Sequence, residues 1–203
     1  MHFTFAFKQD KNCPVFIDGV IHNSFYSGAY DDGMHEDWYY AEPGTSLAPL
    51  PQSLVLVTKD KPYEFDFRSG FKGHIVSGKF LAIFNTLKTA NWEIAELDIV
   101  TPKGISISQS KYFFMRQRHS DKTAEDVIDK ISSKIEYRKT GEIKHISTLV
   151  INSVSDLDIF SINEITLFRR MFLSPAAADA FKTQDMKGFE IVDAHAIGSI
   201  KAA

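Results

Sequence analysis

The sequence predicts an α+β fold with a mixed or mainly antiparallel sheet and a few short helices. Apolar residues make up 44% and charged residues 24% of the 203 residues, which are the proportions of an ordinary globular chain. Aromatic residues lie in short runs such as Phe3–Phe7 and Tyr112–Met115, and such runs favour strands over a helical bundle. A chain of this length buries enough surface to fold without a disulfide or a metal. We therefore expect a single compact domain over residues 1–203, in which residues 1–50 are a candidate N-terminal subdomain.

The first elements are predicted to be a strand and a hairpin. Phe3–Phe7 alternates with a period of two, as a half-buried strand does. Val15–Ile17 and Val20-Ile21 are short apolar runs, and Asp18-Gly19 between them supplies the positive φ of a tight turn. This pattern predicts that the two runs pair with each other.

A long loop is predicted from Asn23 to Pro51, because the periodicity fails there and glycine and proline residues recur. Trp38, Tyr39 and Tyr40 lie at its centre. A loop of this length in a compact domain is usually functional or mobile. It is therefore a candidate for the functional part of the chain.

Strands and one helix are predicted in the middle of the chain. Ser53–Thr58 is a continuous apolar run, typical of a buried strand, whereas Tyr63–Phe67 and Trp92–Val100 alternate as half-buried strands do. Ser77 is a suitable N-cap for a helix, because apolar residues recur at helical spacing over residues 80–87.

The second half of the chain predicts further strands and one well-defined helix. The strands are expected at Lys111–Arg118, His145–Ile151, Ile165–Leu173 and Phe189–Val192. Ser120–Ser133 is ambiguous, because its apolar residues fit both a helix and an alternating strand. Ser174-Pro175 offers an N-cap followed by proline at the first helical position, so a helix is predicted through Phe181.

The sequence lacks the motifs of the common catalytic and metal-binding classes. It has no glycine-rich phosphate loop and no Gly-x-Ser-x-Gly nucleophile elbow. None of the seven histidines forms a His-Glu-x-x-His pair, and Asp31-Asp32-Gly33 with Glu36 lacks the alternating acids of a calcium loop. The single cysteine, Cys13, excludes an internal disulfide and a multi-cysteine zinc site. We predict a protein that is not an enzyme, with no catalytic residues, no cofactor and no metal ligands.

Two other classes of function stay open at this point. A hydrolase or transferase could assemble a dispersed site from residues such as His35, Asp37 and His195, and Asp193 lies on the same face of an extended segment as His195. A small-ligand or nucleic-acid binding module would use the basic aromatic stretch Lys111–Arg118, which matches no ribonucleoprotein motif.

The net charge of −3 is distributed unevenly along the chain. Residues 1–50 carry two lysines against seven acidic residues, a net charge of −5, whereas the remaining residues carry +2. This asymmetry suits a basic protein partner better than a nucleic-acid backbone, although a solvated acidic loop has the same composition. No hydrophobic signal region follows the N-terminus and no apolar stretch approaches 18 residues, so we expect a cytoplasmic protein outside the membrane.

Several short motifs follow one another in a distinctive order from about Pro51 onward. They are Ile75–Phe80, Trp92–Leu97, Tyr112–Met115, Val127–Asp129, Leu167–Arg170, Phe172–Ser174 and Lys187–Glu190. This order resembles that of a bacterial immunity-protein family, formerly a domain of unknown function, which is found beside polymorphic and contact-dependent toxins. The resemblance makes residues 51–203 the family-like core and implies an α+β fold, a cytoplasmic location and no catalytic residues. It also implies strand and turn over Val127–Arg138.

The resemblance further implies that the protein inhibits a cognate toxin by binding it directly and stoichiometrically. We place the toxin contact on the acidic aromatic loop, because exposed Trp and Tyr side chains anchor interfaces and an acidic patch steers a basic partner. The predicted contact residues are Asp31, Asp32, Glu36, Asp37, Trp38, Tyr39 and Tyr40. The alternative for the three aromatic residues is that they pack back onto the domain.

Overall fold

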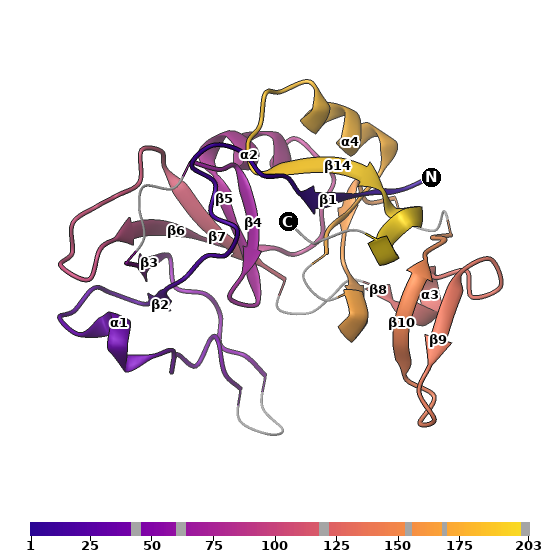
Figure 1. Cartoon of the computed structure of the whole chain (residues 1–203), viewed down its shortest axis with the longest axis horizontal. Helices are drawn as coiled ribbons and strands as arrows, with labels where there is room; N and C mark the ends of the chain where they lie inside the picture. The colour runs from indigo at the N-terminus through magenta and orange to yellow at the C-terminus, as the bar shows by residue number, and fades with distance from the viewer. Residues whose placement is uncertain (42–45, 60–63, 118–121, 153–155, 168–169, 200–203) are drawn as a thin grey trace. The chain divides into compact units, whose positions relative to one another are not determined.

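The computed structural model describes residues 1–41, 46–59, 64–117, 122–152, 156–167 and 170–199. The chain divides into two compact units (Figure 1). The six-stranded unit comprises Gln9–Ala82 and Asn91–Arg118, and the terminal unit comprises Met1–Lys8, Ile83–Ala90 and His119–Ala203. The predicted α+β class with short helices is confirmed. Residues on both sides of position 50 belong to the six-stranded unit, and the organisation as one domain stays a prediction.

A mixed sheet forms the six-stranded unit, in the order β2-β3-β6-β7-β5-β4. Its strands are β2 (Val20–His22), β3 (Ser53–Val57), β4 (Phe67–Gly70), β5 (Gly73–Ser77), β6 (Glu93–Val100) and β7 (Tyr112–Arg116). β3 and β6 run parallel, whereas the other neighbours are antiparallel. The predicted mixed or antiparallel sheet is therefore confirmed.

The central strands follow the apolar patterns of the sequence. β3 confirms the continuous run at Ser53–Thr58, and β6 confirms the alternating run at Trp92–Val100, whose inward residues include Leu97 and Ile99. β7 confirms the strand expected at Lys111–Arg118, although Arg118 lies outside the described residues. The core that these strands form includes Phe114 of β7 and also Trp38.

The predicted hairpin between residues 15 and 21 is wrong. β2 pairs with β3, with Val20 opposite Val57, and Val15 and Phe16 are exposed outside any strand. Gly19 has a φ of 155°, and a Cβ there would lie 2.7 Å from the carbonyl oxygen of Val57. The glycine thus permits a close approach to a distant strand, so the Asp-Gly signal marks the entry into β2 and not a local turn.

The strand expected at Tyr63–Phe67 is also largely wrong, because β4 begins only at Phe67. The backbone N–H of Phe65 donates to the Tyr112 hydroxyl at 3.1 Å, and that hydroxyl donates to the Phe65 carbonyl at 2.9 Å. The Tyr112 hydroxyl therefore satisfies the backbone groups of Phe65 that a neighbouring strand would otherwise pair with. Burial raises the pKa of Tyr112 to about 12. Tyr63 lies outside the described residues.

The remaining elements are short. The six-stranded unit also contains α1 (Ala29–Asp32), and α2 (Gly78–Phe84) follows β5. The Ser77 hydroxyl accepts a hydrogen bond from the Phe80 backbone N–H at 3.1 Å, which confirms the predicted N-cap.

The terminal unit contains three small sheets. Their orders are β11-β13-β1-β14, which is antiparallel, β10-β9, also antiparallel, and the parallel pair β12-β8. The strands are β1 (Phe3–Phe7), β8 (Lys122–Thr123), β9 (Lys134–Tyr137), β10 (Ile143–Thr148), β11 (Ile159–Phe160), β12 (Ile162–Asn163), β13 (Phe172–Leu173) and β14 (Phe189–Asp193). The helices are α3 (Ala124–Val127), η1 (Ile165–Leu167), α4 (Pro175–Lys182) and η2 (Ala194–Ser199). In Figure 1, β1 and β14 lie side by side.

Four predicted elements are confirmed in this unit, namely strands β1, β10 and β14 and helix α4. The Ser174 hydroxyl accepts a hydrogen bond from the Ala177 backbone N–H at 3.1 Å, which confirms the predicted N-cap of α4. Within the ambiguous Ser120–Ser133, residues 120 and 121 lie outside the described residues, and the rest contains β8 and α3. Helix α3 begins with a capping box between Thr123 and Asp126. β9 is the strand implied within Val127–Arg138.

The strand expected at Ile165–Leu173 is wrong over its first part, where η1 lies. Only β13 is extended, and Phe168 and Arg169 lie outside the described residues. Throughout the described residues, no helix combines the length and the apolar character needed to cross a membrane.

Gly73 and Gly70 form a matched pair for testing the sheet, because they face each other in the β4–β5 hairpin. A Cβ at Gly73 would lie 2.6 Å from Phe114 Cζ and 2.7 Å from the Met115 carbonyl oxygen, whereas no described atom lies within 4 Å of a Cβ at Gly70. We expect Gly73→Ala to lower the free energy of unfolding by about 1–3 kcal/mol through overpacking, and Gly70→Ala to change it by less than ~1 kcal/mol. Urea unfolding of both variants measures this, and equal effects would contradict the proposed close packing.

Candidate functional site: an acidic loop anchored on the six-stranded sheet

The long loop predicted from the sequence connects β2 to β3 and is largely ordered by its own contacts. We call residues 23–41 the acidic loop. It contains α1, which follows Gly28 at a left-handed φ of 91°. The backbone N–H groups of Tyr39 and Tyr40 both donate to the Glu36 carbonyl, each at 2.9 Å, and form a second turn. The loop therefore has defined local structure.

Trp38 fixes the loop to the sheet. Its side chain is 1% exposed, and its ring lies 5.7 Å from that of Phe114 on β7, centroid to centroid. The indole N–H donates to the Asn23 side-chain oxygen at 2.8 Å, so the polar edge of the ring is satisfied. Trp38 was predicted as an exposed interface anchor, and this is corrected: it packs back onto the domain, because a large ring gains most by burial.

Arg116 bonds to the backbone at Trp38, in the acidic loop, and at Ala48, beyond it. This side chain is 3% exposed, and its guanidinium donates to Glu93 Oε2 at 3.0 Å, to the Ala48 carbonyl at 2.6 Å and to the Trp38 carbonyl. Arg116 and Glu93 are directly opposite each other on β7 and β6. Burial of a charge is favourable only with such partners, so the carbonyls of Trp38 and Ala48 and the cation require each other.

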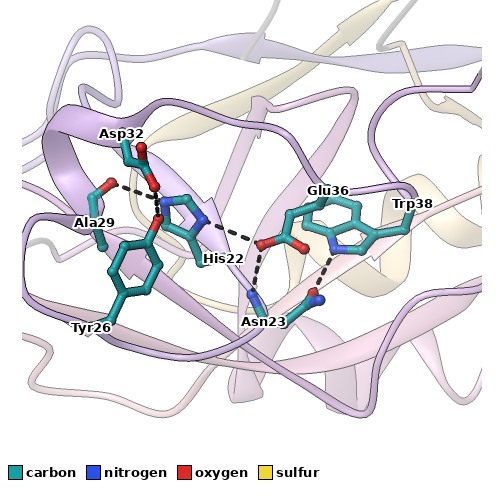
Figure 2. A network of polar contacts seen from close by, with 7 residues as sticks. All are labelled: His22, Asn23, Tyr26, Ala29, Asp32, Glu36 and Trp38. Atoms are coloured by element: carbon teal, nitrogen blue, oxygen red, sulfur yellow. Dashed lines mark hydrogen bonds and ion pairs between the residues drawn. The ribbon is translucent and has the colours of Figure 1, made fainter.

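A polar network connects the loop to the end of β2 (Figure 2). His22 is 1% exposed; its Nδ1 lies 3.3 Å from Glu36 Oε1 and its Nε2 lies 2.9 Å from the Ala29 carbonyl. The Asn23 backbone N–H also donates to Glu36 Oε1 at 3.3 Å. Glu36 is therefore engaged in holding the loop.

Tyr26 and Asp32 form a contact at the surface of the loop. The Tyr26 hydroxyl donates to Asp32 Oδ2 at 2.7 Å, as Figure 2 shows. This hydrogen bond to a carboxylate raises the pKa of Tyr26 to about 12, because the negative charge favours the protonated phenol.

Lys72 orders the two tyrosines at the end of the loop. It donates to the Tyr39 carbonyl at 2.8 Å, and its Nζ lies 4.4 Å and 4.7 Å from the ring centroids of Tyr39 and Tyr40. Phe71 and Lys72 both have positive φ, of 53° and 61°, in the tight turn between β4 and β5. The hairpin therefore places this cation, and Tyr40 remains 53% exposed.

The chain is similar to a described protein family. The sequence profile of the family Immunity protein 43 matches residues 6–197. The chain belongs to this family. Membership confirms the resemblance to a bacterial immunity-protein family and supports an immunity function in general. No curated protein matches the chain.

The extent of the match adds to the prediction from the sequence. The motifs in the sequence began at about Pro51, whereas the Immunity protein 43 match begins at residue 6. The acidic loop therefore lies within the family domain. Its exposed acids are Asp31, Asp32 and Asp37, and the Asp31 carboxylate lies 4.0 Å from Lys59 Nζ in a well-solvated ion pair.

The residues that a dispersed hydrolase or transferase site would use do not all lie in the same unit of the chain. His35 and Asp37 lie in the six-stranded unit and His195 lies in η2 of the terminal unit. Asp193 accepts from the backbone N–H of His195 at 2.8 Å, so this carboxylate caps the turn. A cavity of about 170 Å³ is lined by His2, Asp193 and His195 among others, and burial lowers the pKa of His2.

Within the stretch Lys111–Arg118, the described residues, 111–117, do not form the basic aromatic surface of the nucleic-acid alternative. Tyr112 and Phe114 are buried in the sheet, Arg116 is buried against Glu93, and Lys111 bonds to Glu96 at 2.5 Å. Alternation along a central strand turns Tyr112, Phe114 and Arg116 inward, which is why the composition was misleading.

Sequence reasoning missed His22, Asn23, Tyr26 and Lys72. One signal was present: His22 is a polar residue at the end of the apolar run Val20-Ile21, where a buried polar group requires partners. The partners themselves are 7 and 14 residues away, so their identity depends on the fold of the loop.

Arg116 and Lys111 test whether the buried anchor matters more than an exposed pair on the same strand. We expect Arg116→Met to lower the free energy of unfolding by about 3–5 kcal/mol, because it removes the buried partner of Glu93 and the donor to the carbonyls of Trp38 and Ala48. Lys111 and Glu96 are each 62% exposed. Lys111→Met should therefore change stability by less than ~1 kcal/mol. Urea unfolding followed by tryptophan fluorescence compares them, and similar losses would contradict the anchoring role.

Proposed function

We propose that this chain neutralises a cognate toxin protein by binding it stoichiometrically through the acidic loop, without catalysis. The observation that carries the proposal is the match to Immunity protein 43 over residues 6–197. An inhibitor of this kind needs shape and charge complementarity and no catalytic group. The bacterial cytoplasm is the proposed location, and a toxin of a polymorphic or contact-dependent system is the proposed partner.

The anchoring of the loop supports its use as a binding surface. Trp38 and Arg116 hold the backbone from the inside, and the His22–Glu36 contact holds it from β2. A surface that is ordered before binding loses less conformational entropy in the complex. The buried Trp38 therefore contributes to the proposed interface by positioning its neighbours.

The exposed groups of the loop supply the two types of contact that the proposal needs. Asp31, Asp32 and Asp37 present carboxylates, and the rings of Tyr26 and Tyr40 are 36% and 53% exposed. Carboxylates steer a basic partner during encounter, whereas aromatic rings bury area at the centre of an interface. Glu36 and Tyr39, which are partly buried, act mainly through the structure of the loop.

Capture from the native lysate tests the function. The tagged full-length protein is used as bait, and its retained proteins are identified by mass spectrometry and then produced separately. We expect a stoichiometric partner that inhibits growth when it is expressed alone and does not do so when this chain is co-expressed. A retained partner whose toxicity is unchanged by co-expression would contradict neutralisation.

Charge removal tests the proposed surface with that partner. We expect Asp31→Ser, Asp32→Ser and Asp37→Ser together to weaken binding by roughly 10–100-fold at low salt, mainly through slower association, and to reduce its salt dependence. Glu36 is left intact because its carboxylate bonds within the loop.

The matched control removes three exposed acids of the terminal unit, with Glu142→Ser, Asp179→Ser and Glu190→Ser. This variant has the same net charge as the loop variant. Titration calorimetry and stopped-flow association at two salt concentrations compare the two. Equal losses in both variants would show that net charge, and not the loop, determines affinity.

A further inference from the structure

Two histidines and one glutamate of the six-stranded unit form a compact cluster. Among the described residues, the candidate ligand atoms of His22, His35 and Glu36 all lie within 4.8 Å of one another. His22 is buried at the end of β2, Glu36 is 13% exposed at its side chain, and His35 is exposed. The cluster is therefore rigid on one side and accessible from solvent on the other.

The tautomer of His22 follows from its partners. A carbonyl oxygen only accepts hydrogen bonds, so the Nε2 that lies 2.9 Å from the Ala29 carbonyl carries a proton. In a neutral imidazole, Nδ1 then has a lone pair, and this lone pair faces the carboxylate oxygen of Glu36 at 3.3 Å. Two acceptors face each other favourably only when a cation lies between them, either a proton on Nδ1 or a metal ion.

The spacing of these two atoms suits a metal ion. Zinc–nitrogen and zinc–oxygen bonds are about 2.0–2.1 Å long, so two ligand atoms at a tetrahedral centre lie roughly 3.3–3.4 Å apart. The distance from His22 Nδ1 to Glu36 Oε1 is 3.3 Å. The same distance is long for a charge-assisted hydrogen bond, which is usually about 2.7–2.9 Å.

His35 provides a second imidazole beside the first. The ring centroids of His22 and His35 are 5.5 Å apart, and the exposed His35 side chain has a candidate ligand atom within 4.8 Å of those of His22 and Glu36. Two imidazoles and one carboxylate leave the fourth position of a tetrahedral ion open to solvent.

The residues around the cluster form hydrogen bonds of the kind that orient metal ligands. The Ala29 carbonyl accepts from the ring nitrogen of His22 that faces away from the cluster, and the Asn23 backbone N–H donates to the Glu36 carboxylate. Asn23 is held in turn by the Trp38 indole at 2.8 Å. Such outer hydrogen bonds fix the tautomer of a histidine ligand and the direction of a carboxylate ligand. Figure 2 shows these contacts around His22 and Glu36.

We propose that His22, His35 and Glu36 bind one divalent transition-metal ion of the zinc class, with water in the fourth position. Imidazole nitrogen with a single carboxylate favours zinc, cobalt or nickel over magnesium and calcium, which prefer oxygen ligands. The ion lies between His22 Nδ1 and the Glu36 carboxylate and fastens the acidic loop to β2. The site does not depend on the proposed toxin binding, because the isolated chain contains all three ligands.

Calorimetric titration of the metal-free full-length chain with Zn²⁺ tests the site. We expect one ion per chain with a Kd on the order of 1 µM or lower, and His35→Ala should raise this Kd at least tenfold. His35 is the residue to replace because it is exposed, so the variant keeps its fold. Glu36→Gln should raise the Kd as well, since it removes the carboxylate charge.

The matched control is His145→Ala, which removes an exposed histidine of β10 outside the cluster and should leave the Kd unchanged. Co²⁺ provides a second measurement, because a tetrahedral site with nitrogen ligands gives visible absorption bands that hydrated cobalt lacks. Those bands should appear with the wild-type chain and with His145→Ala, and they should be lost in His35→Ala. Equal Zn²⁺ affinity in wild-type and His35→Ala, or cobalt spectra of the hydrated ion only, would overturn the proposal.

Discussion

Burial of the Arg116 guanidinium is the constraint on which the position of the acidic loop depends. Removing this charge from water costs several kcal/mol, and the cost is offset only if the hydrogen-bond donors meet acceptors. Glu93 on the neighbouring strand supplies one acceptor, and the carbonyls of Trp38 and Ala48 supply two more. The loop therefore cannot leave the sheet without exposing Trp38 and depriving a buried cation of its acceptors.

Because of this anchoring, the groups that position the acidic loop differ from the groups that it exposes. The inward groups, Trp38 and Arg116, determine where the backbone lies, and the outward groups, such as Asp31 and Tyr40, determine what the loop can bind. Exposed carboxylates contribute little to stability, so their replacement leaves the scaffold intact. The outward residues of such a segment can therefore change while the anchor is kept.

The sequence predicted those parts of the fold that local signals determine. Ser174 and Ser77 are N-caps within three residues of the groups that they bond, and the alternation over Trp92–Val100 requires only one buried face. The immunity family also followed from local motifs that begin at about Pro51. In each case the information lies within a few neighbouring residues.

The remaining parts depend on residues that are far apart in the chain. Val20 pairs with Val57 and not with the adjacent apolar run, and the backbone at Phe65 bonds to the phenol of Tyr112. Composition also cannot distinguish the buried Trp38 from the exposed Tyr40, because the difference arises from Phe114 and Arg116 beneath one of them. Only the tertiary structure brings these groups together, so local propensity gave the wrong result at each.

A metal ion at His22 and Glu36 would affect partner binding in two opposing ways. Its positive charge would weaken the attraction of the loop for a basic partner, by about 0.4 kcal/mol for each unit charge at 10 Å in water, and salt would reduce this further. Its bond to His35 would also fix that exposed side chain, and a side chain that is already ordered spares about 0.5–1.5 kcal/mol on association. Because the electrostatic loss is screened and the ordering gain is not, the second effect is the larger at physiological ionic strength. The cluster would then stabilise the loop beneath the acidic surface, and the carboxylates of Asp31, Asp32 and Asp37 would remain exposed to the partner.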